Sequence, residues 1–204
     1  MARPRKFIEA DVIASAGEQF MIAGYGGTTL DDLVKATGLG KQSLYNAFGG
    51  KREVFLKALT AEATEAVAAV DDALANASST PVEKIRAQML KLAIALSTGH
   101  SFGSLFITAT MEMAQRDSDV ANTALSAYTA LRDTYRRCLA DAQAIGQIDS
   151  DVDAGTLAAY FVAVTRGMEV LGNAGVDRAE LTGIALASLR ALPMTGDGDC
   201  MSTP

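Results

Sequence analysis

Apolar residues recur at spacings of three and four along nearly the whole chain, and no alternating β-branched run is longer than a few residues. This spacing matches the helical period, so the sequence predicts an all-α protein of about nine helices. The first predicted helix runs from Ile8 to Ala23, carries Val12 and Phe20 on its apolar stripe, and ends at Gly24. Glycine commonly ends helices because it readily adopts a left-handed backbone.

Two short helices and one long helix are predicted next. Thr29 is placed to cap the first, which ends near Gly38 and has an aspartate in its third position. Gly40 opens the second, which a pair of glycines closes. The long helix extends from Lys51 to Ala75. Two short helices joined by a tight glycine-containing turn have the plan of a helix-turn-helix.

Capping residues mark the later helices. Thr80, Pro81 and Glu83 stand in the order that is typical of a helix start. Further starts are predicted at four capping residues: Ser101, Ser118, Asp153 and Asp177. The resulting pattern predicts a head over residues 1–57, a body over residues 58–192 and a disordered tail over residues 193–204.

Charge is distributed unevenly between the head and the body. The chain as a whole carries −6. Residues 1–57 hold eight Lys or Arg against six Asp or Glu, a net charge of +2, so the rest of the chain carries −8. The basic excess in the head favours nucleic acid as its partner despite the acidic total.

The second short helix, Lys41 to Phe48, is amphipathic. At 100° per residue, Leu44, Ala47 and Phe48 fall on one side. The opposite face consists of residues that hydrogen-bond bases or phosphates: Lys41, Gln42, Tyr45 and Asn46. The pattern predicts a recognition helix that enters the major groove of DNA.

Lys51 and Arg52 stand at the start of the long helix, where two cations oppose the positive end of the helix dipole. A bound anion would remove this conflict. Beside a recognition helix, that anion is predicted to be a DNA phosphate. The alternative interpretation is a pair of solvated surface charges.

Residues 12–59 resemble the DNA-binding domain of the tetracycline-repressor (TetR) family of bacterial transcription regulators. The motifs that carry the resemblance are Gly24-Tyr25, Thr28-Thr29, Gly38-Leu39, Leu44-Tyr45, Phe48 and Lys51. The resemblance implies a three-helix DNA-binding head, a helical ligand-binding body and a homodimer formed mainly by the last two long helices. Gly40, Gln42, Ser43 and Ala47 depart from the usual family pattern, which implies a distinct operator sequence.

DNA contacts are assigned by residue type. Gln42 suits adenine, Lys41 suits guanine or a phosphate, and Asn46 is a second candidate base reader. The candidate contacts that resemble the family's phosphate-contacting positions are Thr29, Ser43, Tyr45 and Lys51, and Thr28 is a further candidate DNA contact. Arg3, Arg5 and Lys6 precede the first helix and form a candidate arm along the DNA backbone or into the minor groove, the alternative being a disordered basic terminus.

Motifs for catalysis and metal binding are missing from the sequence. The segment from Gly38 to Ser43 fails the spacing of a phosphate-binding loop. His100 is the only histidine and has neither a nucleophile motif nor a set of zinc ligands around it. We therefore expect no enzyme activity, no cofactor and no metal. No window approaches eighteen consecutive apolar residues, so we expect a cytoplasmic protein that does not enter a membrane.

The body holds more apolar, flexible and aromatic side chains than a thin bundle needs. Such stripes are usually core, but in a ligand-binding body they also suit a small molecule of low polarity. The candidate ligand contacts are Met89, Leu92, Leu96, His100, Phe102, Leu105, Phe106, Met111, Leu131 and Tyr135. For His100 the alternative is a polar residue at a helix end.

The helix predicted near Asp153–Asn173 has two apolar stripes, so a second chain is expected to cover one of them. The candidate dimer contacts on this helix and the next are Leu157, Tyr160, Phe161, Val164, Gly167, Met168, Leu171, Leu181, Ile184 and Leu189. Together these patterns favour a homodimeric repressor that binds a palindromic double-stranded DNA operator and is released by a small apolar ligand. The alternative is a helical small-molecule or lipid carrier of the same fold that does not bind DNA.

Overall fold

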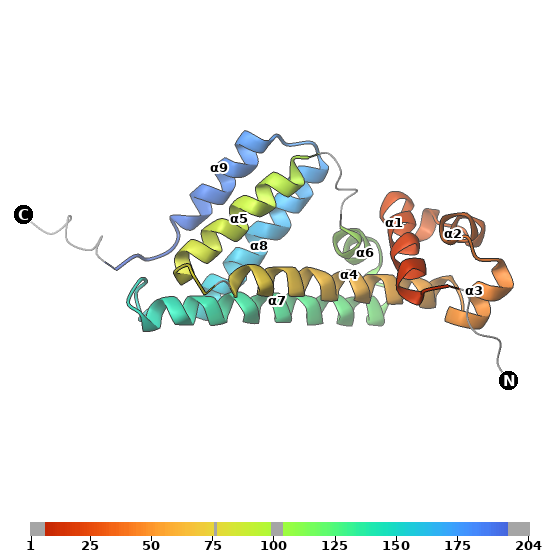
Figure 1. The fold of residues 1–204 in the computed structure, drawn as a ribbon, viewed down its shortest axis with the longest axis horizontal. Coiled ribbons are helices and arrows are strands. Elements are labelled where there is room, and N and C mark those ends of the chain that lie inside the picture. The colour runs from red at the N-terminus through yellow and green to blue at the C-terminus, as the bar shows by residue number, and fades with distance from the viewer. Residues whose placement is uncertain (1–6, 76, 99–103, 196–204) are drawn as a thin grey trace, which may run out of the picture. The chain divides into compact units, whose positions relative to one another are not determined.

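A computed structural model describes residues 7–75, 77–98 and 104–195 of the chain, and within these ranges it contains nine α-helices and no β-sheet (Figure 1). Their bounds are α1 Glu9–Gly27, α2 Leu30–Thr37, α3 Lys41–Phe48, α4 Lys51–Leu74, α5 Pro81–Leu96, α6 Leu105–Met113, α7 Ser118–Ala144, α8 Ala154–Asn173 and α9 Arg178–Leu189. The predicted all-α fold is confirmed.

Local sequence signals set most of the helix ends. Thr29 and Asp32 form a reciprocal capping box at the start of α2, and Thr80 and Glu83 form another at the start of α5. Within α1, Gly24 adopts φ 69° and breaks the helical backbone at the position where the sequence predicts the helix to end. The predicted helix start at Ser101 lies outside the described residues.

The chain divides into two compact units. The first comprises residues 1–66 and 102–127, and so contains α1, α2, α3, α6 and the N-terminal parts of α4 and α7. Its core contains the fully buried rings of Phe20 and Phe55, which lie edge to face with centroids 5.0 Å apart. The partly buried Tyr25 ring packs against them, with its centroid 4.9 Å from that of Phe55. The head predicted over residues 1–57 lies within this unit.

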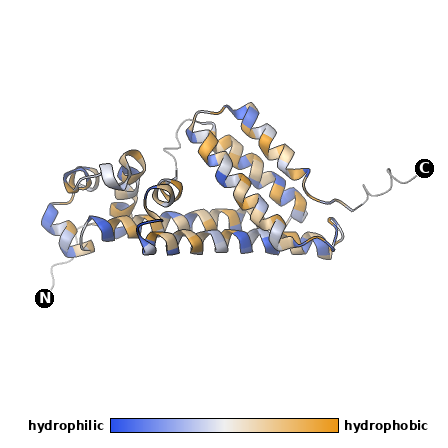
Figure 2. Ribbon diagram, turned by 180° about the vertical axis from the view of Figure 1, so that it is seen from behind, coloured by the Kyte–Doolittle hydropathy of each residue, from blue (hydrophilic) through white to orange (hydrophobic). Residues whose placement is uncertain are grey.

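The second unit comprises residues 67–101 and 128–204. In it α5, α8 and α9 pack against one another, as Figure 1 shows. The core includes Met89 of α5, Tyr135 of α7 and Phe161 of α8, each no more than 1% exposed. Along the long helices α4 and α7, hydrophobic and hydrophilic residues alternate (Figure 2), as expected for helices that bury one face.

The start of the predicted disordered tail is ordered, which corrects that part of the prediction. Met194 forms an isolated β-bridge with Ile148, and the Pro193 carbonyl accepts a hydrogen bond of 2.9 Å from the Asp149 N–H. These backbone groups satisfy one another beside buried Leu192. Residues 196–204 lie outside the described residues.

Candidate nucleic-acid interface

The helix α3 presents the polar face that its sequence predicts. Leu44 and Phe48 are 1% and 5% exposed and pack into the core of the first unit. Gly40 stands at the N-cap, and the Gly49 N–H donates to the Tyr45 carbonyl at the C-terminal end. Two large buried side chains thus anchor this eight-residue helix and leave its outer face free.

All five candidate DNA contacts on α3 are exposed: Lys41, Gln42, Ser43, Tyr45 and Asn46. The Gln42 Nε2 donates to Asn46 Oδ1 at 3.0 Å, so these two amides support each other one turn apart. The Lys41 ammonium lies 2.7 Å from a carboxylate oxygen of Asp31 on α2. Contacts to DNA bases would therefore replace the Gln42–Asn46 and Lys41–Asp31 pairs, and such solvent-exposed pairs cost little to break.

Lys51 has partners inside the protein, contrary to the argument that its charge requires an external phosphate. Its Nζ donates to the carbonyls of Tyr25 and Thr28, both at 2.8 Å, and lies 4.2 Å from the centroid of the Tyr25 ring. The ammonium is therefore paired with carbonyl groups at the C-terminal end of α1 and at Thr28, which follows it. A phosphate contact by Lys51 remains a prediction, but the conflict that motivated it is resolved within the chain.

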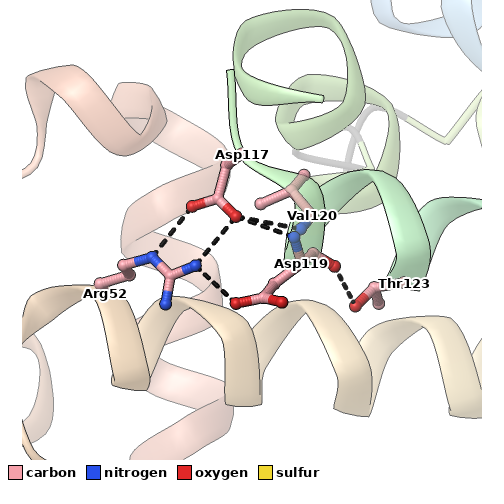
Figure 3. A network of polar contacts seen from close by, with 5 residues as sticks. All are labelled: Arg52, Asp117, Asp119, Val120 and Thr123. Atoms are coloured by element: carbon pink, nitrogen blue, oxygen red, sulfur yellow. Dashed lines mark hydrogen bonds and ion pairs between the residues drawn. The ribbon is translucent and has the colours of Figure 1, made fainter. Parts of the chain in front are cut away.

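Arg52 also has partners inside the chain (Figure 3). Its guanidinium binds Asp117 through two hydrogen bonds of 2.9 Å, and Nη2 binds Asp119 at 2.7 Å. Asp117 in turn accepts the N–H groups of Asp119 and Val120 at the start of α7. The Arg52 hydrogen bonds hold the pKa of Asp117 below its usual value, so this carboxylate is ionised at neutral pH.

The predicted DNA contact at Thr28, which follows α1, is corrected by the structure. Thr28 is only 1% exposed, and its hydroxyl donates to the Gly24 carbonyl at 2.7 Å. A buried hydroxyl that is already bonded within its own turn is not available to a phosphate, so the candidate contact at Thr28 is wrong. Thr29 is exposed, and its hydroxyl is bonded to Asp32. Arg3, Arg5 and Lys6 lie outside the described residues.

The candidate ligand contacts are divided between the two cores. Met89, Leu131 and Tyr135 are buried in the second unit, and Leu92 and Leu96 pack against them. Leu105 and Phe106 belong instead to the core of the first unit, and Met111 is 83% exposed, so these three do not join the others. His100 and Phe102 lie outside the described residues.

One polar pair lies inside the core of the second unit. The Tyr135 hydroxyl donates to Gln88 Oε1 at 2.6 Å, and both side chains are buried. Burial raises the pKa of Tyr135, so the phenol stays protonated and remains a donor. Nearby Cys138 is also buried, which raises the pKa of its thiol to about 11 and makes it unreactive.

The candidate dimer contacts separate into core and surface. Leu157, Phe161, Met168 and Leu181 are at most 8% exposed within a single chain, so they cannot offer a partner much surface, and their assignment to the interface is corrected. The stripe of α8 that carries Tyr160, Gly167 and Val170 is exposed, Tyr160 by 38% and Val170 by 51%. Leu171, on the other predicted stripe, is 37% exposed. A Cβ added at Gly167 would meet no atom within 4 Å. Val164, Ile184 and Leu189 are half-buried.

Two further observations apply to the described part of the chain. It contains no cluster of three or more His, Cys, Asp or Glu residues that could hold a metal ion. None of its helices combines the length and apolarity needed to cross a membrane.

The sequence matches two family models. Residues 12–58 match the bacterial regulatory proteins of the tetR family, and residues 81–182 match the tetracyclin repressor-like C-terminal domain. The first match includes α2, α3 and Lys51, and the second covers α5 to α8.

Relatives align over most of the chain. The HTH-type transcriptional repressor ComR of Escherichia coli is 29% identical over 94% of this chain and 91% of its own length. The HTH-type transcriptional regulator YezE of Bacillus subtilis is 31% identical over 78% of this chain and 83% of its own. A cysteine mutant of the TetR family regulator CifR, complexed with 26bp double-strand operator DNA, superposes with a TM-score of 0.83 at 25% identity, covering 94% of this chain and 100% of that one. The protein is a member of the TetR family of bacterial transcription regulators.

Proposed function

We propose that this TetR family regulator is a repressor that binds a near-palindromic operator as a homodimer in the cytoplasm and is released by a small apolar ligand. The observation that carries the DNA-binding part is the outer face of α3, where Lys41, Gln42, Tyr45 and Asn46 are all exposed on a helix anchored by Leu44 and Phe48. ComR is named a repressor, and CifR was solved on operator DNA, which supports the same role here.

The residues of α3 divide into two groups by chemistry. Gln42 and Asn46 carry amides that pair with the adenine edge, and Lys41 suits guanine or a phosphate. Ser43 and Tyr45 carry hydroxyls that suit phosphate oxygens, as does Thr29 at the start of α2. The first group would then set sequence preference, and the second would fix the register of the helix on the duplex.

Gln42→Ala and Tyr45→Phe are expected to separate these two roles. Loss of the Gln42 amide should cost about 1–3 kcal/mol at one base-pair position and leave binding to unrelated duplexes unchanged. Loss of the Tyr45 hydroxyl should weaken binding to all sequences alike. Affinity for the selected operator and for single-base variants checks both results. A uniform loss for Gln42→Ala would contradict its role as a base reader.

The exposed stripe of α8 supports the homodimer. Tyr160, Gly167 and Val170 lie on one face of the helix, and none of them is buried within the chain. Exposed apolar stripes of this kind mark protein interfaces. A twofold dimer presents two α3 helices to DNA, so its operator is a near-palindrome whose half-sites match their separation.

The core of the second unit supports the ligand. Met89 and Leu131 belong to this apolar core, and the buried Tyr135–Gln88 pair places a hydrogen-bonding group within it. Apolar surroundings with few polar groups suit a mostly apolar small molecule. Release from DNA requires that the ligand favour one state of the protein, with a coupling of about 1–3 kcal/mol in typical cases.

Tyr135→Phe tests the ligand site because it removes the anchor and keeps the ring. Hydrophobic compounds are first screened by thermal shift against the wild type, and each hit is then tested for release of the operator. For a ligand that uses the anchor, the variant should bind it roughly 3–10-fold more weakly and bind the operator normally in its absence. If hits bind but none changes operator affinity at saturation, the ligand-release part of the proposal fails.

A further inference from the structure

The segment Gly24–Thr28, hereafter the α1–α2 turn, contains the helix break at Gly24 and the last residues of α1, and a side chain from α6 binds it. Glu112 lies on α6, more than 80 residues from this turn in sequence. Its Oε2 accepts the Tyr25 N–H at 2.8 Å, and its Oε1 accepts the Gly26 N–H at 2.7 Å. Both carboxylate oxygens thus accept short, charge-assisted hydrogen bonds from two consecutive backbone N–H groups.

The glycines of this turn make room for the carboxylate. A Cβ added at Gly24 would stand 2.9 Å from Glu112 Oε2, and a Cβ added at Gly26 would stand 3.0 Å from Oε1. Real Cβ atoms essentially never show the first distance and rarely the second, so the carboxylate would have to shift, at Gly26 by a few tenths of an ångström. A Cβ added at Gly27 would instead meet only Ala23 Cβ at 3.6 Å, an ordinary contact. The close approach therefore depends on Gly24 and Gly26 rather than on every glycine of the turn.

Lys51 binds backbone carbonyl groups of the same turn. Its Nζ donates to the Tyr25 and Thr28 carbonyls, while Glu112 accepts the N–H groups of Tyr25 and Gly26. The Glu112 carboxylate binds N–H groups of the turn and the Lys51 ammonium binds its carbonyl groups. Together the two side chains fix the turn more firmly than either would alone. The next residue, Thr29, caps α2, and α2 packs against α3. The position of the recognition helix thus depends on how this turn is held.

We propose that Glu112 is a positioning residue for operator binding, which acts by fixing the α1–α2 turn and through it the placement of α2 and α3. The inference rests on the proposed operator binding and extends the DNA-binding machinery to a carboxylate outside the helix-turn-helix. The sign of its effect is distinctive. A merely exposed carboxylate repels DNA phosphates, so removing its charge would strengthen binding, whereas loss of the turn contact weakens it.

Glu112→Gln is the primary test, because it keeps the shape of the side chain. The amide carbonyl of the glutamine can still accept one of the two backbone N–H groups. The amide NH₂ group would face the other N–H, and because both are donors no hydrogen bond can form there. We expect operator affinity to fall about tenfold, or 1.4 kcal/mol. Affinity for an unrelated duplex should stay the same or rise slightly, and the Tyr25 and Gly26 amides should exchange hydrogen at least several-fold faster.

Glu65→Gln is the matched charge control. Glu65 is exposed on α4 in the same unit, and its replacement removes the same charge. It should leave operator affinity unchanged or slightly higher. Gly26→Ala and Gly27→Ala form a second matched pair: the first should weaken operator binding in the same direction as Glu112→Gln, and the second should not.

The outcomes separate the two proposals. If the wild type binds its selected operator and Glu112→Gln binds it equally well or more tightly, the positioning role is overturned while operator binding stands. If Gly26→Ala and Gly27→Ala behave alike with intact melting curves, the positioning role is likewise overturned. If the wild type binds no DNA more tightly than an unrelated duplex, operator binding fails and the inference fails with it.

Discussion

Gly167→Arg is expected to convert the protein to monomers and to lower operator affinity by more than about 100-fold, or 2.7 kcal/mol. The exposed stripe of α8 places Gly167 between Tyr160 and Val170, and open space surrounds it in the single chain. The arginine would therefore fit the isolated protomer, whereas in a dimer it would be buried opposite its own copy. Burying an unpaired charge at an interface typically costs several kcal/mol.

Sedimentation and operator titration measure this effect, with Ala140→Arg as the control. Ala140 is exposed on α7, so its replacement adds the same charge away from the stripe of α8. The control should remain dimeric and bind the operator. A Gly167→Arg protein that sediments as a dimer with unchanged affinity would reject α8 as the interface.

Phe55→Ala is expected to destabilise the first unit by about 3–5 kcal/mol and to abolish operator binding at physiological temperature. Phe55 is fully buried, and its ring contacts those of Phe20 and Tyr25. The substitution removes the aromatic contacts and leaves a cavity that the surrounding helices cannot fill completely. Because the same cluster carries Leu44 and Phe48, α3 loses its support.

Denaturant unfolding followed by circular dichroism measures the stability loss. Ile22→Ala is the control, since Ile22 lies on α1 of the same unit but is 64% exposed. It should change the free energy of unfolding by less than about 0.5 kcal/mol. Equal effects of the two substitutions would show that the aromatic cluster is not the support of the DNA-binding head.

Local signals in the sequence predicted most of the fold. The caps at Thr29, Thr80 and Asp177, and the helix break at Gly24, depend on residues within one or two turns of each other. The two faces of α3 were predictable for the same reason, because helical period alone decides which residues lie beside Leu44. Such features need no knowledge of distant packing.

Features that join distant segments were not predictable. Arg52 meets Asp117 across 65 residues, and Glu112 meets Tyr25 across 87. Nothing in the sequence near Arg52 indicates which carboxylates will stand beside it, so an external phosphate was the only anion that local reasoning could supply. Thr28 was assigned wrongly for a related reason, since only the folded turn shows that its hydroxyl is buried.

The two stripes of α8 show where sequence periodicity reaches its limit. It indicated that both sides of this helix are apolar, but it could not tell which side faces the core. Phe161 and Met168 are buried in the chain, while Tyr160 and Val170 are exposed. The candidate ligand contacts were subject to the same ambiguity, because Leu105 and Leu131 look alike in sequence and lie in different cores.

Selection of bound DNA from a random pool tests the central claim most directly. The account predicts that the wild-type protein enriches a near-palindrome, that Gln42→Ala loses preference at symmetric positions of that sequence, and that Gly167→Arg enriches no two-half-site sequence. Enrichment of no common sequence by the wild type, or enrichment of one that Gln42→Ala selects with unchanged preference at every position, would contradict operator recognition by the exposed face of α3.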